Sequence, residues 1–269
     1  MLKQTITIFI IFCFATVNAV MAQITDPKAT EVWEPVPAKV TPGNWGSAPS
    51  DAIILFDGKD LSAWQKPQFI HERGTVKDMK AMVAELDNNY EHPAADWTVK
   101  DGQFIVKPGT GAIETKEKFG DFQLHIEWLS PADPGKEGQL YSNSGIFMMS
   151  LYEIQVLNSY ENKTYSNGQA GSIYKQHIPL VNATRPPGEW QAYDIVFTAP
   201  RFNEDGSLKS PARVTALHNG VLIQNNVELQ GPTAYIDYSS YFKHPEKMPL
   251  RLQDHGDLVR YRNIWIRHL

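Results

Sequence analysis

The clearest pattern in the sequence is the alternation of apolar and polar residues within residues 143–160, NSGIFMMSLYEIQVLNSY. Glu153 and Gln155 alternate with apolar residues such as Tyr152 and Ile154. Because successive side chains of a β-strand point to opposite faces of the sheet, this predicts a strand with one polar and one apolar face. We expect two strands here, joined by a tight connection. A carboxylate beside an amide, framed by aromatic residues, suits a hydroxyl-rich ligand, so we place the pocket at this stretch.

Strand signals follow quickly from Trp97 to the end of the chain. The stretches WTVKDGQFIVK and PARVTALHNGVLIQNN are predicted hairpins, with Asp101-Gly102 and Asn219-Gly220 as their turns. The segments DFQLHIEW, QAYDIVFTA, LRLQDHG and RYRNIWIRHL are also predicted strands. Many short strands at fairly even spacing, with almost no helical periodicity, predict an all-β sandwich or barrel.

Two stretches lack a clear strand pattern. Residues 23–50 are rich in proline and predict an extended lead-in, partly draped on the domain. Residues 66–95 allow one short helix over Lys77 to Leu86, but no clear periodicity supports it. We therefore interpret residues 66–95 as a loop insertion near the rim of the pocket.

The first 22 residues have the features of a secretory signal peptide. Lys3 supplies a positive charge, Ile6 to Phe14 form an apolar core, and Val20-Met21-Ala22 offer a small-residue cleavage site. The apolar run is too short for a convincing membrane span, although an uncleaved N-terminal anchor is the alternative. We expect an exported protein, periplasmic or secreted, with no membrane attachment after cleavage.

Cysteine usage and net charge narrow the function classes. The one cysteine, Cys13, lies inside the signal segment, and the preceding Ile11-Phe12 are too bulky for a lipoprotein cleavage box. The mature chain therefore uses neither disulfides nor thiolate chemistry, and its stability must come from a sizeable core. Removing the signal takes away one Lys and no acid, so the net charge of -5 becomes -6. An acidic chain without a basic run argues against nucleic acid as a partner. The oligomeric state stays open.

Three segments carry polar side chains on one face of a predicted strand. If the three strands are neighbours in one sheet, these side chains line a single groove. Asn143 and Ser144 would then enter from the edge, and Tyr174 from a long loop. The seven residues on the strands are His125, Glu127, Glu153, Gln155, Arg251, Gln253 and His255.

The chain from about Ile53 to Leu269 resembles a known family. The matching motifs occur in the family's order and are LFDGKDLSAW, WTVKDGQFIV, GDFQLHIEW, NSGIF, YEIQVLNSYENKTY, GQAGSIY, PPGEWQAYDIVF, HNGVLI, RLQDHG and RNIWIR. They are similar to the 3-keto-disaccharide hydrolase-like family, also described as 3-keto-glucoside 1,2-lyase or 3-keto-2-hydroxy-glucal hydratase domains. The resemblance implies a concanavalin A-like jelly-roll β-sandwich over residues 51–269, with the sugar site on its concave sheet.

The resemblance also implies a reaction on a small glycoside or disaccharide. A ketone at C-3 acidifies the proton on C-2, so a base can remove it and the C-1 group then leaves; water adds to the resulting glucal. Glu153 or His255 would be the base, and Glu127 is a further catalytic candidate. Fixed donors, a cation or a metal would stabilise the enolate, and the candidate donors are Arg251, Gln253 and Asn143.

A divalent metal is a second way to stabilise such an enolate. Imidazole and carboxylate ligands from His125, Glu127 or His255 would suit it, but their spacing is not a recognised ligand signature. The metal hypothesis therefore stays open at this point.

Two other functions compete with keto-sugar cleavage. An ordinary glycoside hydrolase would use Glu127 and Glu153 as paired carboxylates, but the laminarinase-type pattern E-x-D-x-x-E is absent. A non-catalytic sugar-binding module is also compatible with this fold.

Each candidate also has a structural interpretation. Glu127 and Glu153 can simply lie on a solvated sheet face, and His125 and His255 can be structural histidines. We expect Asp254 to point away from the groove and hold a turn, and Met148 and Met149 to fill the core.

Overall fold

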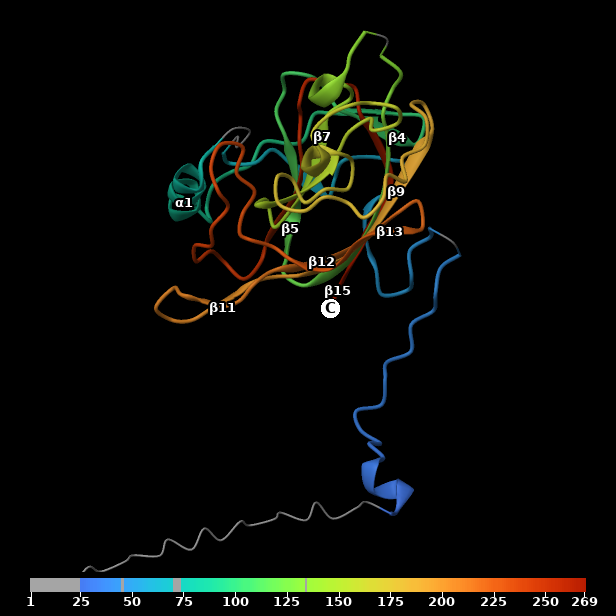
Figure 1. The fold of residues 1–269 in the computed structure, drawn as a ribbon, viewed down its shortest axis with the longest axis vertical. Coiled ribbons are helices and arrows are strands. Elements are labelled where there is room, and N and C mark those ends of the chain that lie inside the picture. Colours follow the sequence, from blue (N-terminus) through green and yellow to red (C-terminus); the bar gives the residue numbers. More distant parts are fainter. Residues whose placement is uncertain (1–24, 45, 70–73, 134) are drawn as a thin grey trace, which may run out of the picture. The chain divides into compact units, whose positions relative to one another are not determined.

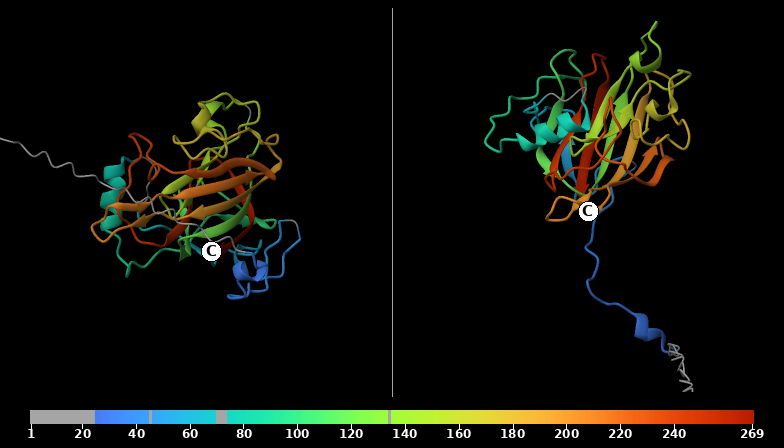
Figure 2. Two further views of the ribbon diagram at one scale, coloured as in Figure 1. Left: turned by 60° about the horizontal axis from the view of Figure 1, so that its bottom comes forward. Right: turned by 60° about the vertical axis from the view of Figure 1, so that its left-hand side comes forward.

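The computed structural model describes residues 25–44, 46–69, 74–133 and 135–269. The predicted signal peptide, residues 1–22, lies outside the described residues. The chain divides into residues 1–39 and residues 40–269. In the first unit, the described part contains a short 3-10 helix, η1 (Pro27–Thr30), which begins with Pro27 after the capping residue Asp26. The second unit is the β-domain shown in Figures 1 and 2.

Two antiparallel sheets make up the β-domain, and their strands come from distant parts of the sequence. The first sheet has the strand order β13-β12-β9-β6-β15-β4-β3, with β1 paired to β15. Its strands are β1 (Ile53–Phe56), β3 (Thr98–Lys100), β4 (Gln103–Ile105), β6 (Phe122–Leu129), β9 (Trp190–Thr198), β12 (Arg213–His218), β13 (Val221–Glu228) and β15 (Arg260–His268).

The second sheet has the strand order β2-β5-β14-β7-β8. Its strands are β2 (Trp64–Gln65), β5 (Ile113–Phe119), β7 (Ser144–Met148), β8 (Tyr152–Val156) and β14 (Met248–Leu252). A small ribbon of β10 (Arg201–Phe202) and β11 (Leu208–Ser210) lies outside both sheets, and short 3-10 helices occur at η2 (Gly138–Leu140) and η3 (Ser166–Gly168).

Both predicted hairpins are confirmed. Asp101 and Gly102 join β3 to β4 with φ angles of 53° and 73°, and Asn219 and Gly220 join β12 to β13 with φ angles of 53° and 79°. Two successive residues with positive φ give a turn whose twist matches that of the flanking strands. Asn and Gly tolerate this conformation best, which is why the dipeptides predicted the turns.

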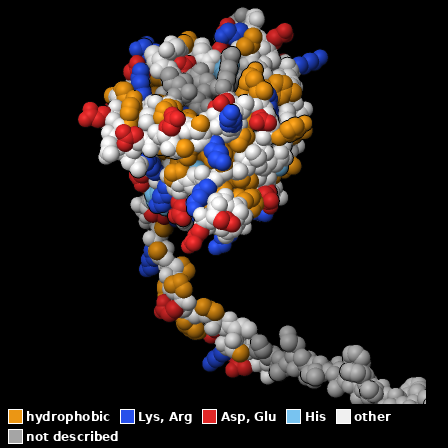
Figure 3. Space-filling model, turned by 90° about the vertical axis from the view of Figure 1, so that its left-hand side faces the viewer, with side chains coloured by type: hydrophobic (Ala, Val, Ile, Leu, Met, Phe, Trp, Pro, Cys, Tyr) orange, Lys and Arg blue, Asp and Glu red, His pale blue; other side chains and the backbone are white. Residues whose placement is uncertain are grey.

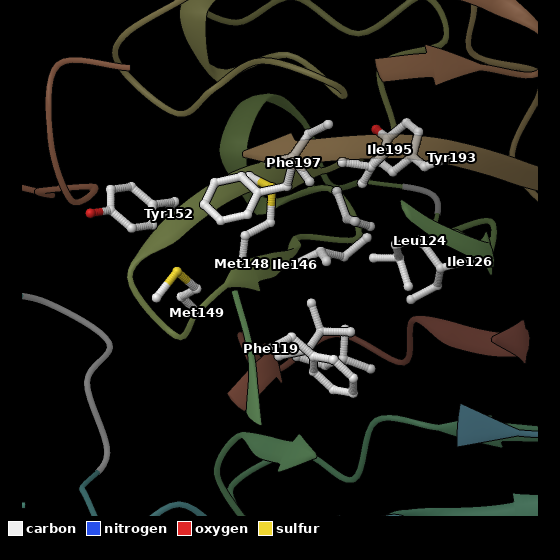
Figure 4. Packing of buried hydrophobic residues seen from close by; sticks show 14 of the residues in the cluster. Phe119, Leu124, Ile126, Ile146, Met148, Met149, Tyr152, Tyr193, Ile195 and Phe197 are labelled. Atoms are coloured by element: carbon white, nitrogen blue, oxygen red, sulfur yellow. The ribbon is translucent and has the colours of Figure 1, made fainter. Parts of the chain in front are cut away.

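The core lies between the two sheets. Side chains of β6, such as Leu124 and Ile126, and side chains of β7, such as Ile146 and Met148, are fully buried in one apolar cluster (Figure 4). On β8, for example, Tyr152, Ile154 and Val156 turn inward, and Glu153 and Gln155 turn outward, as the alternation predicted. The protein is an all-β sandwich of the concanavalin A-like, jelly-roll class. Met148 and Met149 are core residues, as expected.

Residues 66–95 are not one continuous loop, because they contain helix α1 (Val76–Ala84), which overlaps the short helix that the sequence allowed over Lys77 to Leu86. The expected place near the rim of the pocket agrees with Gly74, which lines a cavity described below. Thr75 Oγ1 accepts from the backbone N–H of Asp78 (3.2 Å), and the Asp78 carboxylate accepts from the backbone N–H of Thr75 (2.9 Å). This capping box satisfies donors that the start of a helix leaves unpaired. Figures 1 and 2 show α1 beside the strands of the domain.

The last part of the lead-in contacts the outer face of the first sheet. Asn263 Nδ2 and Trp265 Nε1 both donate to the backbone oxygen of Gly46, at 2.8 and 3.1 Å. These bonds from β15 agree with the expectation that the lead-in is partly draped on the domain.

Charges of both signs are mixed on the surface. On the face shown in Figure 3, Lys and Arg side chains alternate with Asp and Glu side chains, and no large patch of one sign stands out. Within the described ranges, no helix has the length and apolar character needed to span a bilayer.

Candidate functional site

A cavity of about 350 Å³ opens on the outer face of the second sheet. Strands β7 and β8 form its floor. Segments before helix α1, before β7, after β8 and on both sides of β14 form its walls. Its lining residues are Gly74, Gln139, Leu140, Asn143, Phe147, Glu153, Gln155, Tyr165, Tyr174, Thr233, Tyr235, Gln253 and His255. We call it the sugar-site cavity.

Glu153 projects from β8 into the sugar-site cavity and is 5% exposed. Burial raises the pKa of its carboxyl to about 8, although the positive charge of Lys175 opposes the rise. A buried carboxyl without a full set of donors or a close cation prefers its neutral form. Glu153 is therefore protonated at neutral pH, and it can exchange a proton near that pH.

The Gln155 amide lies between Glu153 and Gln139. One end is 3.0 Å from Gln139 Oε1, and the other is 3.1 Å from Glu153 Oε1. The end beside Glu153 is also 3.1 Å from the backbone oxygen of Ser144, which can only accept a hydrogen bond. The Gln155 NH2 group therefore points to this end, where it donates to both Glu153 Oε1 and Ser144 O.

Gly145 makes room for the Glu153 side chain. A Cβ at this position would lie 2.6 Å from Glu153 Oε1 and 2.8 Å from the Phe147 ring. Gly145 pairs directly with Gln155 across β7 and β8, so the carboxyl lies over a backbone without a side chain. The glycine of NSGIF therefore has a steric role in the site.

Aromatic residues line much of the wall. The hydroxyls of Tyr165 and Tyr174 are 2.6 Å apart, and burial raises the pKa of both phenols. The Lys175 ammonium lies 4.5 Å from the centre of the Tyr235 ring. Together with Phe147, these rings offer flat apolar surfaces beside polar groups, the combination that binds the faces and hydroxyls of a sugar ring.

Six of the predicted site residues come together in the sugar-site cavity. They are Asn143, Glu153, Gln155, Tyr174, Gln253 and His255. Asn143 donates through Nδ2 to the backbone oxygen of Gln139 at 2.8 Å, and the Gln253 N–H donates to Gly145 O at 3.0 Å. Asp254 points elsewhere and accepts from the backbone N–H groups of Gly111 and Gly256, as expected for a turn residue.

The prediction that His125 and Glu127 share this groove is wrong. Both lie on β6 in the first sheet, and they line a separate cavity on its outer face. Their strand shows the same polar alternation as β8, but the apolar core separates the two polar faces. The proposed pairing of Glu127 with Glu153 as glycosidase carboxylates is therefore also wrong.

His125 and Glu127 belong to a network of paired charges. His125 Nδ1 lies 2.7 Å from Asp194 Oδ1, and Glu127 accepts from Arg262 Nε at 2.6 Å and from Asn263 Nδ2 at 2.8 Å. Burial lowers the pKa of His125, but bonds to Asp194 and Glu127 outweigh it and raise the pKa to about 9.

The same partners act on Glu127. Burial raises its pKa, but the hydrogen bonds from His125, Asn263 and Arg262 outweigh it and lower the pKa to about 2. Both groups are charged at neutral pH and matched by partners, so they stabilise the first sheet.

Two further residues predicted to line this groove lie elsewhere. Ser144 is fully buried on the core side of β7, where it donates to the backbone oxygen of Gln253 and accepts from the Tyr261 hydroxyl, both at 2.7 Å. Arg251 lies on the outer face of β14 but lines a different cavity, where it pairs with Glu114 at 3.2 Å.

The residues predicted as metal ligands do not meet. His255 is at the second sheet, and His125 and Glu127 are at the first. In the part of the chain that the structure describes, no group of three or more His, Cys, Asp or Glu residues is placed to hold a metal ion.

Several lining residues were missed from the sequence. Phe147 could have been found, because it is two positions from Gly145 on β7 and faces the same side. The others lie outside strands, where no periodicity shows the direction of a side chain; they are Gly74, Gln139, Leu140, Tyr165, Thr233 and Tyr235.

The fold and the sugar-site cavity define a carbohydrate-active protein of the glycosyl hydrolase-like class. Residues 51–267 match the model of the 3-keto-alpha-glucoside-1,2-lyase-like domain, so the chain belongs to this family. A comparison with curated proteins found no match.

Two solved structures from Parabacteroides distasonis ATCC 8503 are similar to this chain. Each is titled a "putative glycosyl hydrolase". The first is 48% identical, with a TM-score of 0.77, and the alignment covers 91% of this chain and 97% of that one. The second is 18% identical, with a TM-score of 0.53 over 81% of this chain and 94% of that one, and supports the fold alone.

Proposed function

We propose that the protein cleaves 3-keto-glycosides at the sugar-site cavity by removing the proton on C-2 and expelling the C-1 substituent. The observation that carries this proposal is the buried Glu153 carboxyl, whose pKa of about 8 suits proton transfer near neutral pH. Amides and aromatic rings surround it, as a sugar ring requires. The family match supports the keto-sugar as the substrate class.

The elimination needs a base at C-2 and a proton for the leaving oxygen. His255 takes the C-2 proton, and the electron pair of the C–H bond moves toward C-3 to give an enolate. When the C-3 carbonyl forms again, the C-1–oxygen bond breaks, and the protonated Glu153 gives its proton to the departing oxygen. Water then adds to the unsaturated sugar at C-1, which completes hydrolysis.

Enolate stabilisation falls to uncharged donors in this cavity. The side-chain amides of Asn143 and Gln253 line it and can donate to an oxygen that gains negative charge. Amide dipoles that are already oriented need little reorganisation during the reaction. Uncharged donors suffice because the C-3 ketone already acidifies the C-2 proton.

One carboxyl distinguishes this chemistry from ordinary glycoside hydrolysis. Glu153 is the one Asp or Glu among the described residues that line the sugar-site cavity. Ordinary retaining or inverting glycosidases use a pair of carboxyls on either side of the bond. A keto-sugar substrate needs no second carboxyl, because the C-1 group leaves after proton removal at C-2.

The test compares a 3-keto-glucoside with its parent glucoside for the wild type and Glu153→Gln. We expect turnover of the keto-sugar alone, and a fall in kcat of about 10²–10⁴-fold for Glu153→Gln. Glu228→Gln, at an exposed position on β13, is the matched control. Equal turnover of both sugars, or full activity of Glu153→Gln, would overturn the proposal. Binding without turnover would identify a sugar-binding module.

The pH profile tests the acid role of Glu153. If its protonated form donates to the leaving oxygen, kcat/KM falls as pH rises above about 8, the pKa of the free enzyme. A rate that instead rises to a plateau above this pH would assign Glu153 as the base. In D2O, loss of the C-2 proton from recovered substrate or product would report the abstraction step directly.

A further inference from the structure

A second cavity of about 290 Å³ lies on the same outer face of the second sheet, over β2, β5 and β14. One row of paired positions runs across the strands, from Gln65 through Glu114, Arg251 and Phe147 to Glu153. Phe147 and Glu153 line the sugar-site cavity, whereas Gln65, Glu114 and Arg251 line the second cavity. We call the second one the Arg251 cavity.

Arg251 is a buried cation with unused hydrogen-bonding capacity. Its side chain is 6% exposed, and its one ion pair joins Nη2 to Glu114 Oε2 at 3.2 Å. Its Nε and Nη1 atoms are buried without any acceptor. Leaving the donors of a charged group unpaired is costly in a protein interior. Since no protein acceptor fixes these two nitrogens, the guanidinium fork can turn toward an acceptor that enters the cavity.

Apolar side chains line part of the Arg251 cavity, beside polar residues such as Gln68 and Asn88. Helix α1 contributes Met82 and Val83, and the residue after the helix turn, Leu86, adds to them. Met248 and Pro249 of β14 continue this surface around the guanidinium. Apolar side chains around a buried cation suit a ligand with an apolar body and one anionic end.

The charges around the Arg251 cavity favour an anion. Its described lining carries three cations, Arg251, Lys118 and Lys247, and two carboxylates, Glu114 and Asp87. This local excess of positive charge occurs in a protein whose formal net charge is -5. A guanidinium with unpaired N–H groups matches a carboxylate in charge and can donate charge-assisted hydrogen bonds to it.

We propose that the Arg251 cavity binds a small monocarboxylate with a flat or branched apolar body, such as an aromatic acid. The carboxylate accepts from Arg251, and the apolar body packs against Met82, Val83 and Leu86. This binding does not depend on the reaction at the sugar-site cavity. The carboxylate can be part of the group released from a glycoside, or a separate small molecule.

The binding test uses the wild-type protein without sugar and a matched set of probes. Calorimetric titration compares benzoate and 3-phenylpropanoate with benzyl alcohol, which lacks the carboxylate, and with acetate, which lacks the apolar body. We expect the two aromatic acids to bind at least tenfold more tightly than either control. Equal binding of benzyl alcohol would overturn the role of Arg251, and no binding of any aromatic acid would overturn the site.

Two tryptophan variants test whether benzoate binds in the Arg251 cavity. Val83→Trp fills it from helix α1 without touching the ion pair, and Ala81→Trp, at an exposed position of the same helix, is its control. We expect Val83→Trp to weaken benzoate binding at least tenfold and Ala81→Trp to leave it unchanged. Unchanged binding by Val83→Trp would overturn the location.

The ion pair has its own variants. Arg251→Met with Glu114→Gln removes both charges together, so no buried charge is left alone, and Arg213→Met with Glu228→Gln changes an exposed pair of the same kind. We expect only the first double variant to lose the preference for benzoate over benzyl alcohol. A preserved preference would show that Arg251 does not hold the carboxylate.

Competition identifies the source of the carboxylate. If it belongs to the leaving group, benzoate raises the apparent KM for the keto-glycoside; if it is a separate ligand, both bind together and KM is unchanged. Either result supports the cavity. A failure of keto-glycoside turnover would remove the proposed function but would leave the calorimetric result standing.

Discussion

At the scale of single residues, the state of Glu153 depends on what surrounds it. The carboxyl is buried over Gly145, between the Gln155 amide and the tyrosine wall, and the nearest cation, Lys175, only partly opposes the effect of burial. Glu127 is a carboxylate on a strand of similar pattern, but Arg262 and Asn263 bind it and keep it ionised. The same residue type thus has a raised carboxyl pKa at one position and a lowered one at the other.

Glu153→Gln should change the pH dependence of stability. The folded-state pKa of about 8 lies above the ordinary glutamate pKa of 4.5, so the folded state holds a proton that the unfolded state loses between these values. Wild-type stability therefore falls as pH rises from about 4.5 to 8. Since glutamine does not ionise, the variant should gain stability relative to wild type across this window. Urea unfolding at several pH values measures the difference, and a constant difference would contradict the raised pKa.

Arg251 and Glu114 should show strong coupling. Arg251→Met alone leaves a buried carboxylate without its cation, which should lower the free energy of unfolding by roughly 3–5 kcal/mol. Adding Glu114→Gln removes that lone charge, so the double variant should be more stable than the single one. Urea unfolding of the single and double variants gives the coupling energy. Additive effects would mean that the two groups do not form a pair in solution.

At the scale of elements, the alternation along a strand predicted which face a side chain lies on, but it did not predict which strands pair in one sheet. The alternation in β8 correctly placed Glu153 and Gln155 on one face, and the turn dipeptides correctly located both hairpins. The polar face of β6 carries the same signal, yet this strand belongs to the other sheet. A local pattern fixes the face of a side chain, whereas pairing between distant strands decides which cavity that face borders.

Helix α1 shows a second limit of pattern recognition. Its nine residues are too few for a strong periodic signal. The capping pair Thr75 and Asp78 at its start is a sequence signal that the prediction did not use. We expect Thr75→Ala to destabilise the helix by about 1 kcal/mol. Amide hydrogen exchange within Val76–Ala84 should then be faster, with Lys77→Ala as the control at an exposed position. Unchanged exchange would show that packing alone holds the helix.

At the scale of the whole domain, the sandwich separates two kinds of polar face. The second sheet carries the sugar-site cavity and the Arg251 cavity, whereas the first carries a network of matched charges around His125 and Glu127. The core between them keeps these faces apart, so we expect substitutions in the charge network to leave the proposed reaction unaffected.

Glu127→Gln should therefore lower stability and spare activity. The pKa of Glu127 in the folded state, about 2, lies below the ordinary glutamate pKa of 4.5. The stability advantage of the wild type is therefore present above about pH 4.5 and is lost as pH falls toward 2. We expect keto-glycoside turnover within twofold of wild type and effects additive with Glu153→Gln. Thermal unfolding from pH 2 to 7 and turnover assays check both parts. A large loss of turnover would return Glu127 to the catalytic groups.

The row from Gln65 to Glu153 limits how this sheet can change in evolution. Inserting or deleting one residue inside β14 or β8 would reverse the direction of every side chain beyond that point, bringing Ile154 outward in place of Glu153. Length variation among relatives should therefore concentrate in the connecting segments that wall the two cavities. Such proteins can acquire new substrates by lengthening their loops, while the strands that form the floor of the cavities keep their length and pairing register.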